Sequence, residues 1–147
     1  LKINGAGKVE HAHLERSTLG DRATEKCMLA ELKRRSWPKP VGGEHGLARK
    51  SFDFDPPNDV RPATEWDAEE VSEPLAELKA RIGECKAGGS GDFEATAYVA
   101  TDGSVLAASV TPPDESGDAS VDCLVEAVAS TKFPSPGSWP AKVTFSL

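Results

Sequence analysis

The sequence lacks the long apolar runs that a membrane-spanning helix requires. Hydrophobic residues make up 38% of the 147 residues, and no stretch approaches the roughly 20 consecutive apolar residues of a bilayer span. No secretory signal peptide is visible, and the chain begins at Leu1 in what we interpret as the middle of a strand. We therefore expect a fragment or processed product without membrane insertion, whose own start does not report its compartment.

Clustered basic residues are also scarce. Residues 1–54 hold 11 Lys and Arg against 7 Asp and Glu, whereas residues 55–147 hold 6 against 17, which gives the net charge of −7. A phosphate-binding surface needs clustered cations. The only basic run, Lys33-Arg34-Arg35, is better explained as cations at the C-terminus of a helix. We expect no nucleic-acid partner.

Catalytic and metal-binding motifs are missing as well. No nucleophile elbow occurs, and the three cysteines are dispersed without a CxxC pair, which argues against zinc. His11 and His13 are two residues apart and therefore lie on the same face of a predicted strand, about 6–7 Å from each other. They are weak metal candidates if His45 or Glu15 supplies a third ligand, and a solvated strand face is the alternative. We predict no enzyme activity, no cofactor and no metal.

The sequence contains an internal repeat. A shift of 96 residues superimposes Gly7 on Gly103 and Cys27 on Cys123 without a gap. The same shift matches Val9 with Val105, Ala12 with Ala108, Leu14 with Val110, Ala23 with Ala119, Trp37 with Phe133, Pro38 with Pro134 and Pro40 with Pro136. Because a cysteine and a Pro-x-Pro recur in one register, we interpret the chain as a tandem duplication of a small unit.

The first unit is predicted over residues 1–54. Alternation of apolar and polar residues predicts strands at 1–4 and 9–16. A helix at 22–35 begins after Asp21 as its N-cap, and Pro38 and Pro40 prevent its continuation. A closing strand is predicted at 47–54.

The second unit is predicted over residues 67–147, after a proline-rich linker at 55–66. Its leading helix begins with Ser72 as cap and Pro74 in the first turn. One apolar stripe of this helix consists of Val71, Leu75, Leu78, Ile82 and Cys85. Strands at 93–100 and 105–111, a helix at 119–131 and a closing strand at 141–147 follow.

The predicted fold class is therefore α+β. It consists of two tandem β-β-α-β units, each a small antiparallel sheet packed on a helix, and the second unit carries an extra leading helix. We expect this architecture because the predicted elements of residues 1–54 recur in the same order after the linker.

Three cysteines allow three pairings. Cys85 ends a helix that should pack beside the helix of Cys123, so we predict a Cys85–Cys123 disulfide that closes a loop of about 38 residues. Cys27 is then expected to be an unpaired, mostly buried thiol, whose equivalent partner would lie in a helix upstream. The alternative is that all three are reduced thiols in the core.

These motifs resemble the TonB-like C-terminal domain. They are Gly7–Leu14, Ser17–Asp21, Cys27, Trp37–Pro40 and Phe52–Phe54, and in the second copy Gly103–Val110, Asp118, Cys123, Phe133–Pro136 and Phe145–Leu147. The variant with a leading and a helical cysteine is similar to the AgmX/PglI-type C-terminal modules of myxobacterial envelope proteins. The resemblance covers about two thirds of the chain in two copies.

The resemblance implies a β-β-α-β fold, a periplasmic or cell-envelope location, and a protein or peptide partner in place of catalysis. TonB-type domains capture an extended peptide by adding it as a strand to a sheet edge. The candidate edges are the two closing strands, with Leu47, Arg49, Ser51, Val143, Phe145 and Leu147. Two alternatives stay open: a rigid structural spacer whose units bury their edges in each other, and a His-based metal protein.

Overall fold

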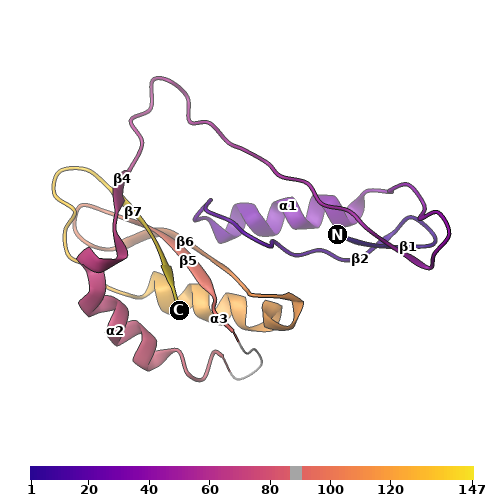
Figure 1. Cartoon of the computed structure of the whole chain (residues 1–147). Helices are drawn as coiled ribbons and strands as arrows, with labels where there is room; N and C mark the ends of the chain where they lie inside the picture. Colours follow the sequence, from indigo (N-terminus) through magenta and orange to yellow (C-terminus); the bar gives the residue numbers. More distant parts are fainter. Residues whose placement is uncertain (87–90) are drawn as a thin grey trace. The chain divides into compact units, whose positions relative to one another are not determined.

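The computed structural model describes residues 1–86 and 91–147. These residues form two compact units, Leu1–His13 with Ala23–Arg61, and Leu14–Arg22 with Pro62–Leu147. The described residues form three α-helices and two small sheets (Figure 1). The predicted α+β class with β-β-α-β-like units is confirmed.

The first unit contains a three-stranded antiparallel sheet in the order β2-β1-β3 and one helix. The strands are β1 (Lys2–Asn4), β2 (Val9–His11) and β3 (His45–Leu47), and the helix is α1 (Arg22–Arg34). The strands predicted at 9–16 and 47–54 are wrong in length. Because β1 has only three residues, it can form backbone hydrogen bonds with little more than three residues of β2 and of β3. The two neighbouring strands are therefore short as well.

The second unit contains a four-stranded sheet in the order β4-β7-β5-β6. The strands are β4 (Thr64–Trp66), β5 (Glu94–Val99), β6 (Val105–Thr111) and β7 (Ala141–Ser146). β4 pairs with β7 in parallel, whereas the other two ladders are antiparallel. The helices are α2 (Ser72–Arg81) and α3 (Asp118–Ala129), preceded by the 3₁₀ turns η1 (Ala68–Val71) and η2 (Glu115–Gly117).

The core of this second unit lies between one face of its sheet and the two helices. The predicted stripe of α2 is buried at Val71, Leu75, Leu78 and Ile82. It joins Leu124 and Val128 of α3 and the inward residues of the strands in one cluster, which includes Phe93, Ala95, Ala97, Val99, Val143 and Phe145. Alternate residues of β5 enter this cluster because successive side chains of a strand point to opposite faces.

The predicted linker ends three residues too late. Thr64 to Trp66 form β4, where Thr64 lies opposite Ala141 and Trp66 opposite Val143. The Trp139 indole N–H donates a hydrogen bond to the Pro62 carbonyl at 3.0 Å. A strand of three residues whose partner lies almost eighty residues away has no local signal that a sequence reading could detect.

The start of α2 also differs from the prediction. Ser72 is the first residue of α2, and Val71 before it makes no capping bond. Asp67 instead caps η1, because it accepts from the Glu69 N–H at 3.1 Å while the Glu70 carboxylate accepts from the Asp67 N–H at 3.0 Å. This reciprocal pair is a capping box that begins η1, and η1 continues directly into α2.

Residues Leu14–Arg22 group with the second unit, which differs from the predicted boundary at residue 54. Gly20 has a φ of +71° and lies against Tyr98 and Thr96. These two side chains alternate with the buried Ala95 and Ala97, so the segment crosses the sheet face opposite the core. Two ion pairs also hold it, Arg16 with Glu94 at 4.0 Å and Arg22 with Asp122 at 2.9 Å.

Backbone geometry recurs 96 residues apart around two hairpin turns. Gly7 and Gly103 both have positive φ, +78° and +83°. The Gly7 carbonyl accepts from the Trp37 N–H, and the Gly103 carbonyl accepts from the Phe133 N–H, both at 2.9 Å. Each hydrogen bond ties a hairpin turn to the chain that follows a helix, so α1 and α3 are bracketed by the same contacts.

A β-bulge recurs at the same spacing. The pairs Lys2–His11 and Ile3–Val9 leave Glu10 as the extra residue, and the pairs Tyr98–Ala107 and Val99–Val105 leave Leu106. The two closing strands are related by a shift of 95 residues, one less than the 96 of the other elements, because Ile3 pairs with Gly46 and its counterpart Val99 pairs with Ala141. The loop after Pro-x-Pro is therefore one residue shorter in the second unit.

The β5–β6 turn supplies a pH prediction. Asp102 Oδ1 accepts from the Ser104 hydroxyl at 2.6 Å and from the Ser104 N–H at 2.9 Å, and these bonds hold the pKa of Asp102 below its usual value. In Ser104→Ala the hydroxyl bond is lost, so we expect the Asp102 pKa to rise toward the usual value in a carboxyl NMR titration.

The sign of the linked stability change follows from the direction of this shift. A carboxyl with a lowered folded pKa stabilises the fold above its unfolded pKa, and this stabilisation is lost as pH falls through the folded pKa. Ser104→Ala should therefore lose less stability on acidification than the unaltered chain. An unchanged Asp102 titration curve in the variant would contradict the prediction.

Candidate functional site: sheet edges and the surface cysteine

The second closing strand does not form an open edge. β7 lies between β5 and β4, and β4 pairs with it over Ala141 to Val143. The side chains of Val143, Phe145 and Leu147 are buried in the core. The predicted peptide-binding edge is therefore wrong at Val143, because the chain's own Trp66 pairs with it on that side. Phe145 and Leu147 lie beyond the pairing with β4, and their side chains are buried.

The first closing strand does lie at an edge, but it is short. β3 pairs only with β1, and the Leu47 side chain is 86% exposed. Pairing extends one residue further, because the Ala48 N–H donates to the Leu1 carbonyl at 3.0 Å and the Leu1 amino group donates to the Ala48 carbonyl at 2.8 Å. Arg49 and Ser51 lie beyond the strand, so of the predicted residues only Leu47 lies on the edge strand.

Sequence reasoning missed the longest edge strand, β6. It has seven residues and ends the sheet next to β5. Its bulge residue Leu106 is 62% exposed, because the bulge turns this side chain out of the regular alternation. An apolar residue between Val105 and Ala107 that breaks the expected alternation was the only sequence signal available.

The backbone directions on β6 follow from its partner. Phe93 accepts from the Leu147 N–H at 2.9 Å, so odd residues of β5 direct their bonding groups toward β7 and even residues toward β6. The even residues pair with Ala107, Ser109 and Thr111. Ala108 and Val110 lie between them and direct their N–H and C=O groups away from β5. Both residues are nevertheless buried, with 6% and 1% exposure, so this side of β6 is covered.

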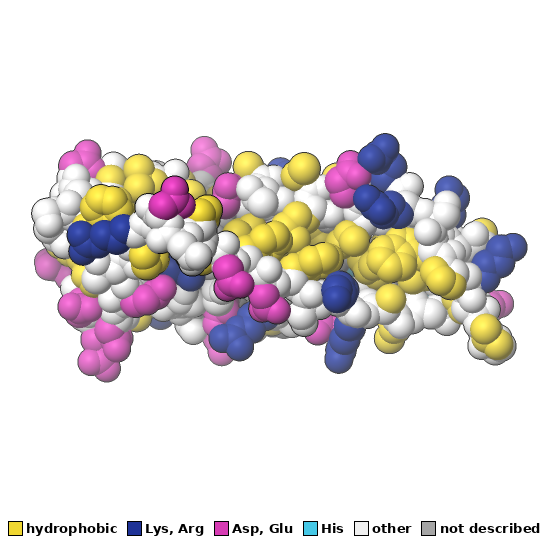
Figure 2. Space-filling view, turned by 90° about the horizontal axis from the view of Figure 1, so that it is seen from above, with side chains coloured by type: hydrophobic (Ala, Val, Ile, Leu, Met, Phe, Trp, Pro, Cys, Tyr) yellow, Lys and Arg dark blue, Asp and Glu magenta, His cyan; other side chains and the backbone are white. Residues whose placement is uncertain are grey.

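Large hydrophobic side chains also reach the surface. Hydrophobic side chains are visible on the surface between charged ones (Figure 2). The most exposed of them lie in residues 41–60 of the first unit and at the β6 bulge, namely Val41, Leu47, Phe52, Phe54, Val60 and Leu106. Exposed apolar side chains near a strand edge are the kind of surface that a protein partner covers.

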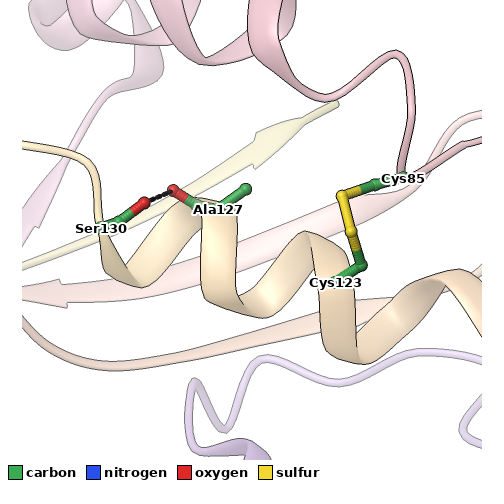
Figure 3. Close-up of a disulfide and its surroundings, with 4 residues drawn as sticks. All are labelled: Cys85, Cys123, Ala127 and Ser130. Atoms are coloured by element: carbon green, nitrogen blue, oxygen red, sulfur yellow. Dashed lines mark hydrogen bonds between the residues drawn. A yellow bond between two sulfur atoms is a disulfide. The ribbon is translucent and has the colours of Figure 1, made fainter.

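Cys85 and Cys123 form a disulfide, as predicted (Figure 3). Cys85 follows the C-terminus of α2 and Cys123 lies on α3, and their Cα atoms are 5.6 Å apart. The bond therefore joins the two helices that cover the sheet. Close to it, the end of α3 is closed by the Ser130 hydroxyl, which donates to the Ala127 carbonyl at 2.9 Å.

Cys27 is a free thiol on α1, but it is exposed and not mostly buried as predicted. The reason is local. Cys123, at the equivalent position of α3, is exposed as well, so this position of the helix faces outward in both units.

The histidines do not come together with a third ligand. The His11 and His13 ring centroids are 5.4 Å apart, but His45 Nε2 lies 2.9 Å from Glu10 Oε2 instead of joining them. Within residues 1–86 and 91–147, no group of three or more His, Cys, Asp and Glu side chains is placed to hold a metal ion. The geometry thus offers no support for the metal alternative.

No helix in the described ranges is long and apolar enough to cross a bilayer. Comparisons with protein-family models, with curated proteins and with solved structures found no match to this chain. The functional conclusion therefore depends on the chain's own residues and geometry.

Proposed function

We propose that this chain is a non-catalytic protein-interaction module that binds an extended segment of a partner at a sheet edge. The observation that carries the proposal is the edge strand β3, which pairs on one side with β1 and whose Leu47 is 86% exposed. Main-chain hydrogen bonds to such an edge supply affinity, and alternate side chains supply specificity. The longer edge strand β6 is a second candidate, but its residues 108–111 are buried, so a partner segment would have to displace what covers them.

The side chains around β6 indicate what the partner segment should look like. Ala108 and Val110 point into the core beneath α3, whereas Ser109 and Thr111 point to the opposite, hydroxyl-rich face. A strand added beside β6 would therefore meet an apolar side and a polar side. We expect a partner segment that alternates apolar and polar residues.

The compartment and the evolutionary origin belong to the same proposal. A disulfide persists in oxidising compartments, and the Cys85–Cys123 bond supports a periplasmic or cell-envelope location. The hydrogen bonds and bulges that recur at a spacing of 96 residues support a tandem duplication. The resemblance of the motifs to TonB-like domains agrees with both inferences.

The spacer alternative differs in a feature of the sheets. A spacer whose units bury their edges in each other would be favoured by one continuous sheet through both units. The strands of residues 1–86 and 91–147 form two separate sheets instead, with β6 and β3 at edges. This observation favours the binding proposal over the spacer.

Amide hydrogen exchange tests the edge proposal residue by residue. In the free chain we expect the N–H group of Leu47, which points away from β1, to exchange about a hundredfold faster than that of Ala48, which donates to the Leu1 carbonyl. A panel of peptides of about ten residues with alternating apolar and polar side chains serves as the probe. A binding peptide should slow exchange at Leu47 selectively.

The amides of Ala141 to Val143 serve as the internal control, because β7 is paired on both sides there. Their exchange should not respond to peptide. If no peptide of the panel slows exchange at Ala108, at Val110 or along β3, the edge-binding proposal is contradicted.

A further inference from the structure

The face of the second sheet that points away from the core is polar. Two neighbouring cross-strand pairs lie on it, Glu94 with Thr111 and Thr96 with Ser109. These residues alternate along β5 and β6 with side chains of the core cluster, so their side chains share the opposite face. Ser109 and Thr111 are buried all the same, with 1% and 4% exposure. Buried polar groups are almost always hydrogen-bonded in native proteins, so each of these hydroxyls requires a partner.

Only part of this requirement is met by other side chains. The Thr96 hydroxyl lies 3.0 Å from the Thr144 hydroxyl of β7, and these two groups satisfy each other. Among residues 1–86 and 91–147, the hydroxyls of Ser109 and Thr111 and the Oε1 atom of Glu94 are buried without a hydrogen-bond partner. Leaving such a group unpaired carries a desolvation penalty, so three unmet groups on one face point to a further binding partner.

The three oxygen atoms come from adjacent positions of the sheet. Glu94 and Thr111 lie directly opposite each other, and residues paired in this way have Cβ atoms about 4.5–5.5 Å apart. Ser109 is two residues before Thr111, which makes it the next residue on the same face, about 7 Å along the strand. A small group above the middle of this patch can therefore reach all three side chains.

The segment of residues 14–22 crosses this same face. Gly20 lies against Thr96, and the Arg16 Nε atom lies 4.0 Å from Glu94 Oε1. A distance of 4.0 Å is too long for a direct hydrogen bond. Polar groups at such a separation are often joined by a water molecule that bonds to both. The ion pair is thus a second indication of a small polar group beside Glu94.

We propose that Glu94, Ser109 and Thr111 bind one internal water molecule where residues 14–22 cross the sheet face. Water suits this set of groups because it can donate to the carboxylate oxygen while it exchanges hydrogen bonds with both hydroxyls. The described residues place no group of three His, Cys, Asp and Glu side chains that would hold a metal ion there instead. The site lies on a sheet face, so it is independent of partner binding at the strand edges.

Magnetic relaxation dispersion of water ¹⁷O tests the proposal, because it detects internal water molecules with long residence times. The double variant Ser109→Ala with Thr111→Val removes two of the three partners and nearly preserves side-chain shape. We expect its dispersion amplitude to fall by the contribution of one water molecule. Ser146→Ala is the matched control. Ser146 pairs with Glu94 from the other side but is exposed, so the amplitude should stay unchanged.

A crystal structure of the unaltered chain supplies a second measurement that does not depend on the folding of a variant. We expect a water oxygen within about 3.2 Å of at least two of the three oxygen atoms. An unchanged dispersion amplitude in the double variant, or the same loss in the control, would overturn the proposal. So would a crystal structure with no density at this place, or with density at the oxygen distances of a bound metal ion, about 2.0–2.6 Å.

Discussion

Gly103→Ala is expected to destabilise the second unit by about 3 kcal/mol or more. Gly103 has a φ of +83°, a conformation that a residue with a Cβ adopts only at a cost. A Cβ placed there would also collide with the carbonyl oxygen of Phe133. That oxygen belongs to the backbone that follows α3, and it cannot move without breaking the hydrogen bond between Phe133 and Gly103.

A matched variant separates the two costs. Gly137 also has positive φ, +95°, but a Cβ there would meet no atom within 4 Å. Gly137→Ala should therefore cost only about 1–2 kcal/mol, the conformational part alone. Urea unfolding followed by the amide NMR signals of the second unit measures both variants. Equal losses for the two would mean that the contact with Phe133 contributes nothing.

The first unit offers the same experiment in duplicate. A Cβ at Gly7, φ +78°, would collide with the carbonyl oxygen of Trp37. Gly7→Ala should destabilise the first unit for the same reason, and the loss should appear in the NMR signals of that unit. A loss of stability in only one of the two variants would mean that the equivalent contacts around α1 and α3 do not contribute equally to stability.

Cys85→Ala is expected to lower the free energy of unfolding of the second unit by about 3–4 kcal/mol under oxidising conditions. The disulfide closes a loop of 38 residues, and in the chain-entropy model this constraint on the unfolded chain accounts for a stabilisation of that size. A domain of this size has a limited core, so the loss should be a large part of its stability.

Reducing conditions provide the control for this prediction. In excess reductant the unaltered chain loses the same bond, so Cys85→Ala and the unaltered chain should unfold at nearly the same urea concentration. Cys27→Ala should change little in either condition, because that thiol is exposed and unpaired. An equal loss for Cys85→Ala with and without reductant would mean that the cysteine stabilises the unit by packing alone.

The disulfide and the edge strand carry different parts of the functional proposal. The disulfide joins α2 to α3, the two helices that cover one face of the sheet. The direction of the backbone groups of Ala108 and Val110 depends instead on the ladder between β6 and β5. Loss of the disulfide should therefore weaken the fold before it changes which backbone groups are offered.

The candidate site was only partly predictable, and the two closing strands show why. Ala141 to Leu147 reads as a strand because its apolar residues alternate, and β7 confirms that part. Whether a strand lies at an edge depends on what pairs with its other side. For β7 that partner is β4, a strand of three residues that precedes α2 in the chain. β6 was predicted as a strand but not as the outermost one.

The sequence by itself determined the local elements: β5, β6, α1, α3 and the stripe of α2. Alternation, apolar spacing and prolines act within a few residues of one another, so their effects can be read along the chain. Only the tertiary structure decided that Leu14–Arg22 crosses the second sheet, that β4 covers β7, and that Cys27 faces solvent. Each of these depends on which distant segments compete for the same surface, and that competition leaves no pattern in either segment alone.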